Sequence, residues 1–525
     1  MRFPFTGAGI LVAVMAYGCM AGPNYRRPAV TVSKNWIEAS GKSGRVSNRA
    51  SDYRNWWKMF HDPVLDRLVG LAYRNNLSLQ IAGVRVIEAR AELGIAAGNF
   101  FPQTQQVGGS MARDRTSRSF PQALGTPLEF TQDQVEANAG WEMDFWGKFR
   151  RGIQSAGASW LESAADYDNA LVSLVADVAV AYINVRTLQK RIDIARRNAE
   201  TQEESLRIAQ TKLRYGVVSQ LDVDQAASVL NSTLATIPQL ESQMRQQKDA
   251  LSVLLGMAPQ NMADILKGPL RIPVAPPTVV AGIPADLLRR RPDVRSAEYA
   301  AMAQCAQIGV AKSYLYPAFS ISGVFGFLSS NAGNASLANV FKWENRFYEV
   351  GPSFEWSIFN YGRIKNDVRL QDARFQELLL NYQNIVLAAQ RDVEDNLAAF
   401  LKAQDRADYL AKSTRAAKDA LDIAVMRYRE GTTDFTTVLT AEQSLLSDQD
   451  SLASTLGNIS IGLVGVYRAL GGGWETREGR QLVPPAVIKE MSRRTDWGGL
   501  LVPASYNPPA AETPKLKNSI RSPDW

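Results

Sequence analysis

The sequence predicts a mainly α-helical chain with a smaller β-sheet portion, built from one unit of long helix and strand pair that occurs twice. Three observations predict this fold class. The sequence matches itself at an offset of 215 residues, two stretches of more than a hundred residues contain no proline, and a segment of alternating apolar and polar residues lies at or near the start of each stretch.

The first residues have the features of a secretory signal that ends at a cysteine. Arg2 is followed by an apolar run over 8–16, which is too short for a membrane span of about 20 residues but suits the h-region of a signal. Cleavage just before Cys19 would leave a thiol beside a free amino group, which can carry lipid. We therefore predict a signal peptide over 1–18 and a lipid-anchored segment over 19–61, with Cys19 as the lipidation site. The alternative is an ordinary cleavage site with an incidental cysteine.

Composition narrows the function classes. The chain has 46% apolar and 21% charged residues and a formal charge of +7. Its basic residues are interspersed with acidic ones along helical stretches, which favours solvated helix faces over nucleic-acid binding. The second cysteine, Cys305, lies in an alanine-rich stretch and is expected to be a small buried hydrophobe. After the signal no apolar stretch reaches the length of a spanning helix, so a membrane crossing would need a barrel of strands.

The internal match defines the domains. The markers that recur at the 215-residue offset are Pro102 and Pro317, Trp141 and Trp356, Gly147 and Gly362, Asp177-Val178 and Asp392-Val393, Gly216 and Gly431, and Leu255-Gly256 and Leu470-Gly471. Markers spread over more than 150 residues indicate a duplicated structural unit. We assign the first repeat to 62–276, the second to 277–474, and a mostly disordered tail, rich in proline and small residues, to 475–525.

Each copy is expected to read helix, strand pair, very long helix, turn, helix. In the first long helix, from about Phe149 to Arg214, apolar residues recur at alternating spacings of three and four, which is a heptad seam. At 1.5 Å per residue this helix would be roughly 100 Å long. The expected seam positions are Leu171, Leu174, Val178, Ala181, Val185, Leu188, Ile192, Ala195 and Ala199, and in the second copy Val386, Ala389, Val393, Asn396, Phe400, Ala403, Ala407 and Leu410.

The strand signal precedes each long helix. Apolar and polar residues alternate over 135–145 and again over 348–358, with a well-alternating partner at 319–327 and a weak one at 104–112. This pattern is typical of a strand with one face in lipid and one in water, although a half-buried soluble strand gives the same alternation. Four strands cannot close a membrane barrel, since the smallest have eight. If these strands enter a membrane, several chains must therefore share one barrel.

The turns after the long helices have well-formed helix ends. In "KLRYGVVSQLDVDQA" Gly216 can end one helix and Ser219 can cap the next, and in "RYREGTTDFTTVLTAEQ" Gly431 and Asp434 can do the same. Two well-made turns explain these residue types without any further role. The single histidine, His61, is expected at a solvated helix start, and the twelve methionines form no cluster that would indicate a copper route.

Several segments together resemble the TolC-like outer-membrane factors of tripartite efflux pumps, in particular the NodT-type lipoproteins. "GCMAGPNYRRP" is similar to their lipidated start and "WWKMFHDPVLDRLV" to their first helix. "RRPDVRSAE" is similar to the opening of their second repeat and "SIFNYGR" to their second strand-to-helix passage. The resemblance covers about Cys19 to Trp474, although the family usually has leucine where this chain has Ala16.

The resemblance implies a homotrimer in the outer membrane, with a 12-stranded β-barrel continued by an α-helical tunnel across the periplasm. It also implies a periplasmic adaptor and an inner-membrane pump as partners, with the turns at the periplasmic mouth as the adaptor contacts. The residues that it assigns there are Gly216, Ser219, Gly431, Thr432 and Asp434. For the aperture of the mouth we expect rings of Asp222 and Asp224, held by partners such as Arg214 or Arg427. Some relatives carry an acid where this chain has Thr440, so the gate can differ here.

The expected function is a passive outer-membrane exit duct for small toxic compounds. One alternative is a duct for type I protein secretion, and another, from a different class, is a periplasmic coiled-coil scaffold or adaptor. An enzyme is the least supported class, because the sequence offers no nucleophile–base pair, metal constellation or phosphate-binding loop, and no cofactor is expected.

Overall fold

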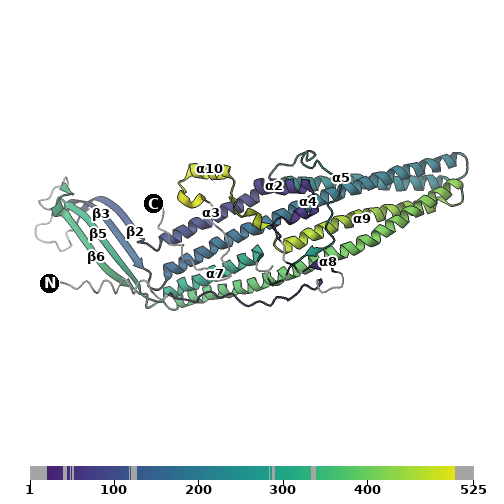
Figure 1. The fold of residues 1–525 in the computed structure, drawn as a ribbon. Helices are drawn as coiled ribbons and strands as arrows, with labels where there is room; N and C mark the ends of the chain where they lie inside the picture. Colours follow the sequence, from purple (N-terminus) through teal and green to yellow (C-terminus); the bar gives the residue numbers. More distant parts are fainter. Residues whose placement is uncertain are drawn as a thin grey trace.

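The chain folds into an elongated bundle of long helices with a β-sheet at one end. The computed structural model describes residues 20–502 apart from 39–43, 48, 50–51, 118, 120–126, 283, 286–289 and 333–338. In Figure 1 the sheet lies at one end, two helical hairpins end together at the other, and the long helices run between them.

The elements follow the predicted order in both copies. The first copy consists of α3 (Leu77–Gly98), β2 (Thr104–Arg115), β3 (Glu129–Met143), α4 (Lys148–Arg214) and α5 (Gln220–Leu254). The second consists of α7 (Pro292–Ser313), β5 (Ala318–Ser330), β6 (Arg346–Glu355), α8 (Arg363–Glu430) and α9 (Phe435–Ala469). The smaller elements include β1 (Val46–Ser47), η2 (Trp56–Phe60), α2 (Pro63–Asn75), β4 (Val279–Val280), η4 (Trp343–Asn345), η5 (Trp474–Arg477), α10 (Pro485–Arg494) and η6 (Gly498–Leu501).

The duplication is confirmed by helix lengths. Helices α3 and α7 have 22 residues each, and α5 and α9 have 35 each. The two long helices, α4 and α8, have 67 and 68 residues. At 1.5 Å per residue each long helix spans about 100 Å, as predicted.

Helix α4 is the central rod of the chain. It packs against α3 and α5 of its own repeat and against α7 and α9 of the other, and α8 packs beyond α7 and α9. All nine seam positions predicted for α4 are buried. In α8, Val386, Ala389, Val393, Phe400 and Ala407 are buried, whereas Asn396, Ala403 and Leu410 are half-buried. The expectation that no apolar stretch after the signal reaches the length of a spanning helix is wrong for one window of α4, which is apolar enough to cross a membrane. Because 78% of this window is buried inside the protein, its apolarity serves the helical core.

In each repeat the end of one helix meets the start of another at a tight joint: α5 meets α3 in the first repeat, and α9 meets α7 in the second. Helix α5 ends against the start of α3, where the Asn76 side-chain amide donates to the Leu254 carbonyl at 3.0 Å. Gly256, with φ +70°, follows this end, and a Cβ there would lie 2.2 Å from the Asn75 carbonyl oxygen. Glycine is therefore required both by the left-handed conformation and by the close approach.

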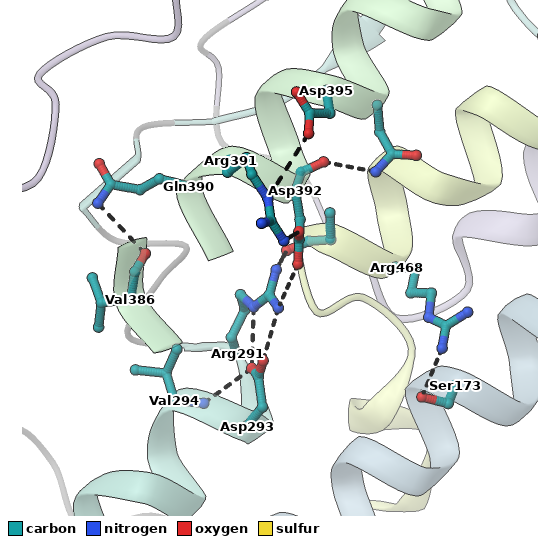
Figure 2. Close-up of polar contacts among 12 residues, drawn as sticks. Ser173, Arg291, Asp293, Val294, Val386, Gln390, Arg391, Asp392, Asp395 and Arg468 are labelled. Atoms are coloured by element: carbon teal, nitrogen blue, oxygen red, sulfur yellow. Dashed lines mark hydrogen bonds and ion pairs between the residues drawn. The ribbon is translucent and has the colours of Figure 1, made fainter. Parts of the chain in front are cut away.

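The second joint uses arginine in place of asparagine. Arg291 precedes α7 and donates from Nη1 to the Ala469 carbonyl, the last of α9, at 2.6 Å. Figure 2 shows that the same guanidinium also reaches Asp293 at 2.7 Å and Asp392 of α8 at 3.6 Å. The second joint thus ties three helices together where the first ties two.

The motif "RRPDVRSAE" is used for structure along its length. Pro292 opens α7, and Arg290 pairs with Glu475 at 2.7 Å. Arg295 pairs with Asp168 of α4, a fully buried carboxylate that Arg477 also contacts. The polar side chains of this motif are therefore engaged in holding α7 to its neighbours.

The four-stranded sheet is antiparallel throughout, in the order β2-β3-β5-β6. In the first hairpin Thr104 lies opposite Gly140, whereas in the second Ala318 lies opposite Glu355. The offset between β2 and β5 is thus 214 residues, while β3 and β6 keep 215. The expectation of one constant offset is wrong here, because Gln103 is an extra residue before β2. Its side chain accepts from the Glu142 amide at 2.7 Å and donates to the Asn99 carbonyl at 3.0 Å.

The N-terminal segment runs along the outside of the rods from the base of the sheet. The Ala21 amide donates to the Trp146 carbonyl at 2.8 Å, and the Arg151 guanidinium donates back to the Ala21 carbonyl. Further on, Arg27 pairs with Glu298 at 2.6 Å and Arg45 with Asp405 at 2.8 Å. The predicted signal peptide and Cys19 lie outside the described residues.

The predicted disorder of the tail is wrong for residues 475–502. Helix α10 and η6 pack on the outer side of α3, where Met491 and Val483 are buried beside Ile87 (Figure 1). Arg90 of α3 donates to the carbonyls of Leu500 and Val502 at 2.8 Å. The tail prediction rested on composition and overlooked the apolar stripe of α10, which Val487, Ile488 and Met491 form at helical spacing. Residues 503–525 lie outside the described part.

Candidate functional site: the open sheet and the helical tips

One face of the sheet is apolar and exposed. The cross-strand pairs put the predicted apolar set of β3 on the same face as the odd-numbered residues of β2 and β5 and the even-numbered residues of β6. Exposed apolar side chains on this face are Val107, Met111, Ile321, Phe325, Tyr348, Val350 and Phe354, with exposed fractions from 41% to 81%. A soluble protein rarely presents so large an apolar patch, which marks an interface with lipid or protein.

The opposite face of the sheet is mainly polar. It carries Gln106, Ser110, Gln134, Glu136, Asn138, Ser320, Ser322, Glu349 and Ser353, with Val324, Leu328 and Phe347 as its apolar members. The alternation therefore matches a strand with lipid on one side and water on the other. Because β2 and β6 are the outer strands of this sheet, each leaves one row of backbone groups without a strand partner in the described chain.

The first helical tip joins α4 to α5. Gly216 has φ +71°, and nothing lies within 4 Å of where its Cβ would be. Ser219 caps α5 in a capping box, in which its amide and hydroxyl both donate to the Asp222 carboxylate at 3.0 and 3.2 Å. Both Gly216 and Ser219 are exposed, as an adaptor contact requires.

The second tip joins α8 to α9. Gly431 has φ +75°, and Asp434 caps α9 by accepting from the Thr437 amide at 3.0 Å and the Thr437 hydroxyl at 2.6 Å. These hydrogen bonds to the Thr437 side chain and backbone lower the pKa of Asp434. The Thr432 hydroxyl donates to the Arg427 carbonyl at 3.1 Å. Gly431, Thr432 and Asp434 are all exposed.

The two tips are packed against each other. The Lys212 ammonium donates to the Tyr428 carbonyl and lies 4.2 Å from the centre of the Tyr428 ring. The ring in turn packs against Phe435, with 5.0 Å between centroids, inside an apolar cluster that α4, α5, α8 and α9 share. Burial, and then the nearby charge of Asp222, raise the pKa of Tyr428. Nothing in the turn sequences alone predicted this contact between tips.

The predicted aperture residues are not paired with one another within the described chain. The Asp222 carboxylate accepts the hydrogen bonds of the capping box, and Asp224 accepts from the side-chain amide of Gln220 at 2.8 Å. Arg214 and Arg427 are exposed, and no ion pair joins either to Asp222 or Asp224 among the described residues. Pairing between copies of the chain stays a prediction.

Sequence reasoning missed two features of the tips. Tyr215, Val217 and Leu221 of the first tip are exposed apolar residues, with exposed fractions of 81%, 64% and 62%. Above the tips, Glu442 is buried and accepts from the Ser205 hydroxyl at 2.6 Å, and burial raises its pKa. The first feature could have been read from the sequence as apolar residues in a turn, whereas the second depends on how α4 meets α9.

The described residues contain no group of histidine, cysteine and carboxylate side chains that could hold a metal. His61 ends η2 with φ 46°, just before Asp62 caps α2. Cys305 is buried, and burial raises the pKa of its thiol. His61 is exposed just before the start of α2, and Cys305 is buried, as predicted.

Comparison with known proteins gives a consistent result. The family model of the outer membrane efflux protein matches residues 68–257 and 283–472. Nodulation protein T of Rhizobium leguminosarum bv. viciae is 29% identical over 475 residues, which is 90% of this chain and 94% of that protein. The pyoverdine export outer membrane protein OpmQ of Pseudomonas aeruginosa is 33% identical over 436 residues, or 81% of this chain and 89% of that protein.

Two solved structures extend the comparison to the fold. The outer-membrane channel OprN has a TM-score of 0.80 and 32% identity, covering 87% of this chain and all of that one (100%). The CmeC outer membrane channel of Campylobacter jejuni has a TM-score of 0.80 and 25% identity, covering 91% of this chain and 99% of that one.

Proposed function

The chain belongs to the outer membrane efflux protein family, and from this premise we propose that it forms the outer-membrane duct of a tripartite efflux pump. The duct conducts small toxic compounds to the exterior without bond chemistry of its own. The proposal rests on one observation: the same chain has a sheet with an exposed apolar face and helices about 100 Å long.

The open sheet supports a trimer. Four strands with two free edges fall short of the eight that the smallest membrane barrel needs, and three copies supply twelve. This number agrees with the trimer that the family resemblance implies. Closure would remove the free edges of β2 and β6, which otherwise favour aggregation.

The path of the N-terminal segment supports a lipid anchor at Cys19. Met20 packs against Gly147, where the sheet meets α4, so the chain enters the described structure at the membrane end. A lipid on the preceding residue would reach the inner leaflet beside the barrel. Mass spectrometry of the mature protein tests this, with an unmodified Cys19 as the contradicting result.

The tips support an adaptor contact at Gly216, Ser219, Gly431, Thr432 and Asp434. Thr432→Arg places a long cation in an exposed turn and should abolish pump activity while the trimer still assembles. Ser492→Arg on α10 is the matched control, since its exposed hydroxyl also donates to a backbone carbonyl, that of Lys489, far from the tips. Equal pump activity in the two variants would count against the tip as the docking site.

The aperture is tested by removing charge without removing the cap. Asp222→Asn with Asp224→Asn keeps side-chain acceptors at the start of α5 but removes six negative charges from a trimeric mouth. We expect the cation preference of single channels to fall. Unchanged conductance and selectivity would show that Asp222 and Asp224, with Arg214 and Arg427, do not form the gate.

The duct itself is tested by retention of a fluorescent efflux dye. Cells that lack the protein should retain more dye, and the intact chain should restore export. Equal retention with and without the chain, for every dye that the pump exports, would contradict the proposal.

A further inference from the structure

The chain contains a template for its own assembly. Strands β3 and β5 meet where the first repeat touches the second, and in a ring of copies the second repeat of one chain touches the first repeat of the next. The pairing of β3 with β5 is known residue by residue, for example Asn138 opposite Val324 and Trp141 opposite Ile321. The free edges of β6 and β2 are the counterparts of this pair.

The two repeat offsets predict which residues of β6 and β2 would face each other between chains. The β6 residue equivalent to a given β3 residue has a number higher by 215, and the β2 residue equivalent to a given β5 residue has a number lower by 214. We infer that β6 pairs with β2 of a second copy in one antiparallel register, with Ser353 opposite Ser110 of the partner subunit. The same register places Phe354 opposite Gly109 of the partner subunit and Trp356 opposite Val107 of the partner subunit. This inference rests on the proposed trimeric duct and specifies its joint.

The register keeps both faces of the sheet continuous. Phe354 and Pro352 lie on the apolar face of β6, and Gly109, Met111 and Val107 lie on the apolar face of β2. A shift by one residue would place the apolar face of β6 beside the polar face of β2, because side chains alternate with a period of two. The extra residue Gln103 is what makes the two faces agree.

The end of β6 supports the same register. In the first repeat, Trp141–Met143 pair only with β5, because β2 begins opposite Gly140. Their counterparts are 356–358, which the sequence predicted as strand but which lie beyond the end of β6 at Glu355. In this register the pairing partners of 356–358 are residues 105–107 of a second copy. Because the single chain lacks these partners, β6 ends before 356. Ile358 is 65% exposed in the single chain.

An aromatic contact at the base of the sheet also has an unpaired counterpart in the second repeat. Trp146 donates from its indole to the Pro317 carbonyl at 2.8 Å and stacks on Tyr316 with 4.6 Å between centroids. The counterpart of Trp146 is Tyr361, which is fully exposed (101%) in the single chain. In the ring it would meet Phe101 and Pro102 of the partner subunit, the counterparts of Tyr316 and Pro317.

Disulfide trapping tests the register in the full-length lipoprotein within outer membranes. In a Cys305→Ala background, Ser110→Cys with Ser353→Cys should yield a covalent trimer on a denaturing gel after mild oxidation. The matched control shares one site: Ser110→Cys with Gly351→Cys, whose residues would face each other only if β6 were shifted by two positions. Asn138→Cys with Val324→Cys, the template pair, should form a disulfide within one chain and no covalent trimer.

The outcomes separate the register from the function. A covalent trimer from the first pair and little from the control supports the register. A trimer from the control and not from the first pair overturns it but leaves the proposed duct intact, as does a native trimer in which neither pair crosslinks while the template pair does. Absence of any trimer in native gels of the Cys305→Ala protein would instead contradict the proposed trimeric duct.

Discussion

At the scale of the residue, Asp168 holds together parts of the chain that are far apart in sequence. It is fully buried on α4 and accepts hydrogen bonds from Arg295 of α7 and Arg477 of η5. Asp168→Asn would remove the buried negative charge that two buried guanidinium groups share, which costs about 3–5 kcal/mol of stability. Thermal unfolding in detergent measures the loss.

The control for this substitution is an exposed ion pair on the same helix. Asp177 meets Arg468 at 3.1 Å, and both side chains are about half exposed. Asp177→Asn should cost no more than about 1 kcal/mol. Equal losses from Asp168→Asn and Asp177→Asn would show that burial of the Asp168 cluster contributes nothing.

Glu162 gives the rods a dependence on pH. Burial on α4, and then the nearby charge of Asp166, raise the pKa of Glu162 from 4.5 to about 7. Between these two pKa values the folded chain holds a proton that the unfolded chain releases. The contribution of Glu162 to stability is therefore fully present below pH 4.5 and is lost as the pH rises through about 7. In Glu162→Gln this part of the pH dependence should disappear from thermal unfolding curves. An unchanged curve, matching that of Glu203→Gln at an exposed position of α4, would contradict the assignment.

At the scale of the element, the helix joints explain why a leucine–glycine pair recurs in both repeats. Gly256 and Gly216 have nearly the same φ, +70° and +71°, so alanine at either position meets the same backbone strain. Only at Gly256 would the new Cβ collide, with the Asn75 carbonyl. Gly256→Ala should therefore lower the unfolding temperature clearly more than Gly216→Ala does. Equal shifts would mean that the joint between α5 and α3 yields without cost.

At the scale of the whole molecule, the sequence predicted the periodic features of each repeat but not the contacts between segments that are distant in sequence. The seam of α4, from Leu171 to Ala199, follows from heptad spacing, because one buried face must recur at that period. The clamp of Lys212 on Tyr428 joins residues 216 apart in sequence, and no local pattern specifies it. The ordered tail was missed for a related reason, since α10 is stabilised by its contact with α3 and not by its composition.

In the assembled trimer, residues 356–358 should be paired as a strand, whereas in the single chain they lie beyond the end of β6. Residues 356–358 follow the end of β6, and their counterparts Trp141–Met143 are paired with β5. Pairing with β2 of a second copy would give the amides of 356–358 the same protection from hydrogen exchange that 141–143 have. Mass spectrometry of the native channel in detergent measures both segments in one experiment, with 141–143 as the protected reference. Exchange at 356–358 that is much faster than at 141–143 would mean that the closing pair ends with β6 itself, and that the first repeat is no guide to the joint between chains.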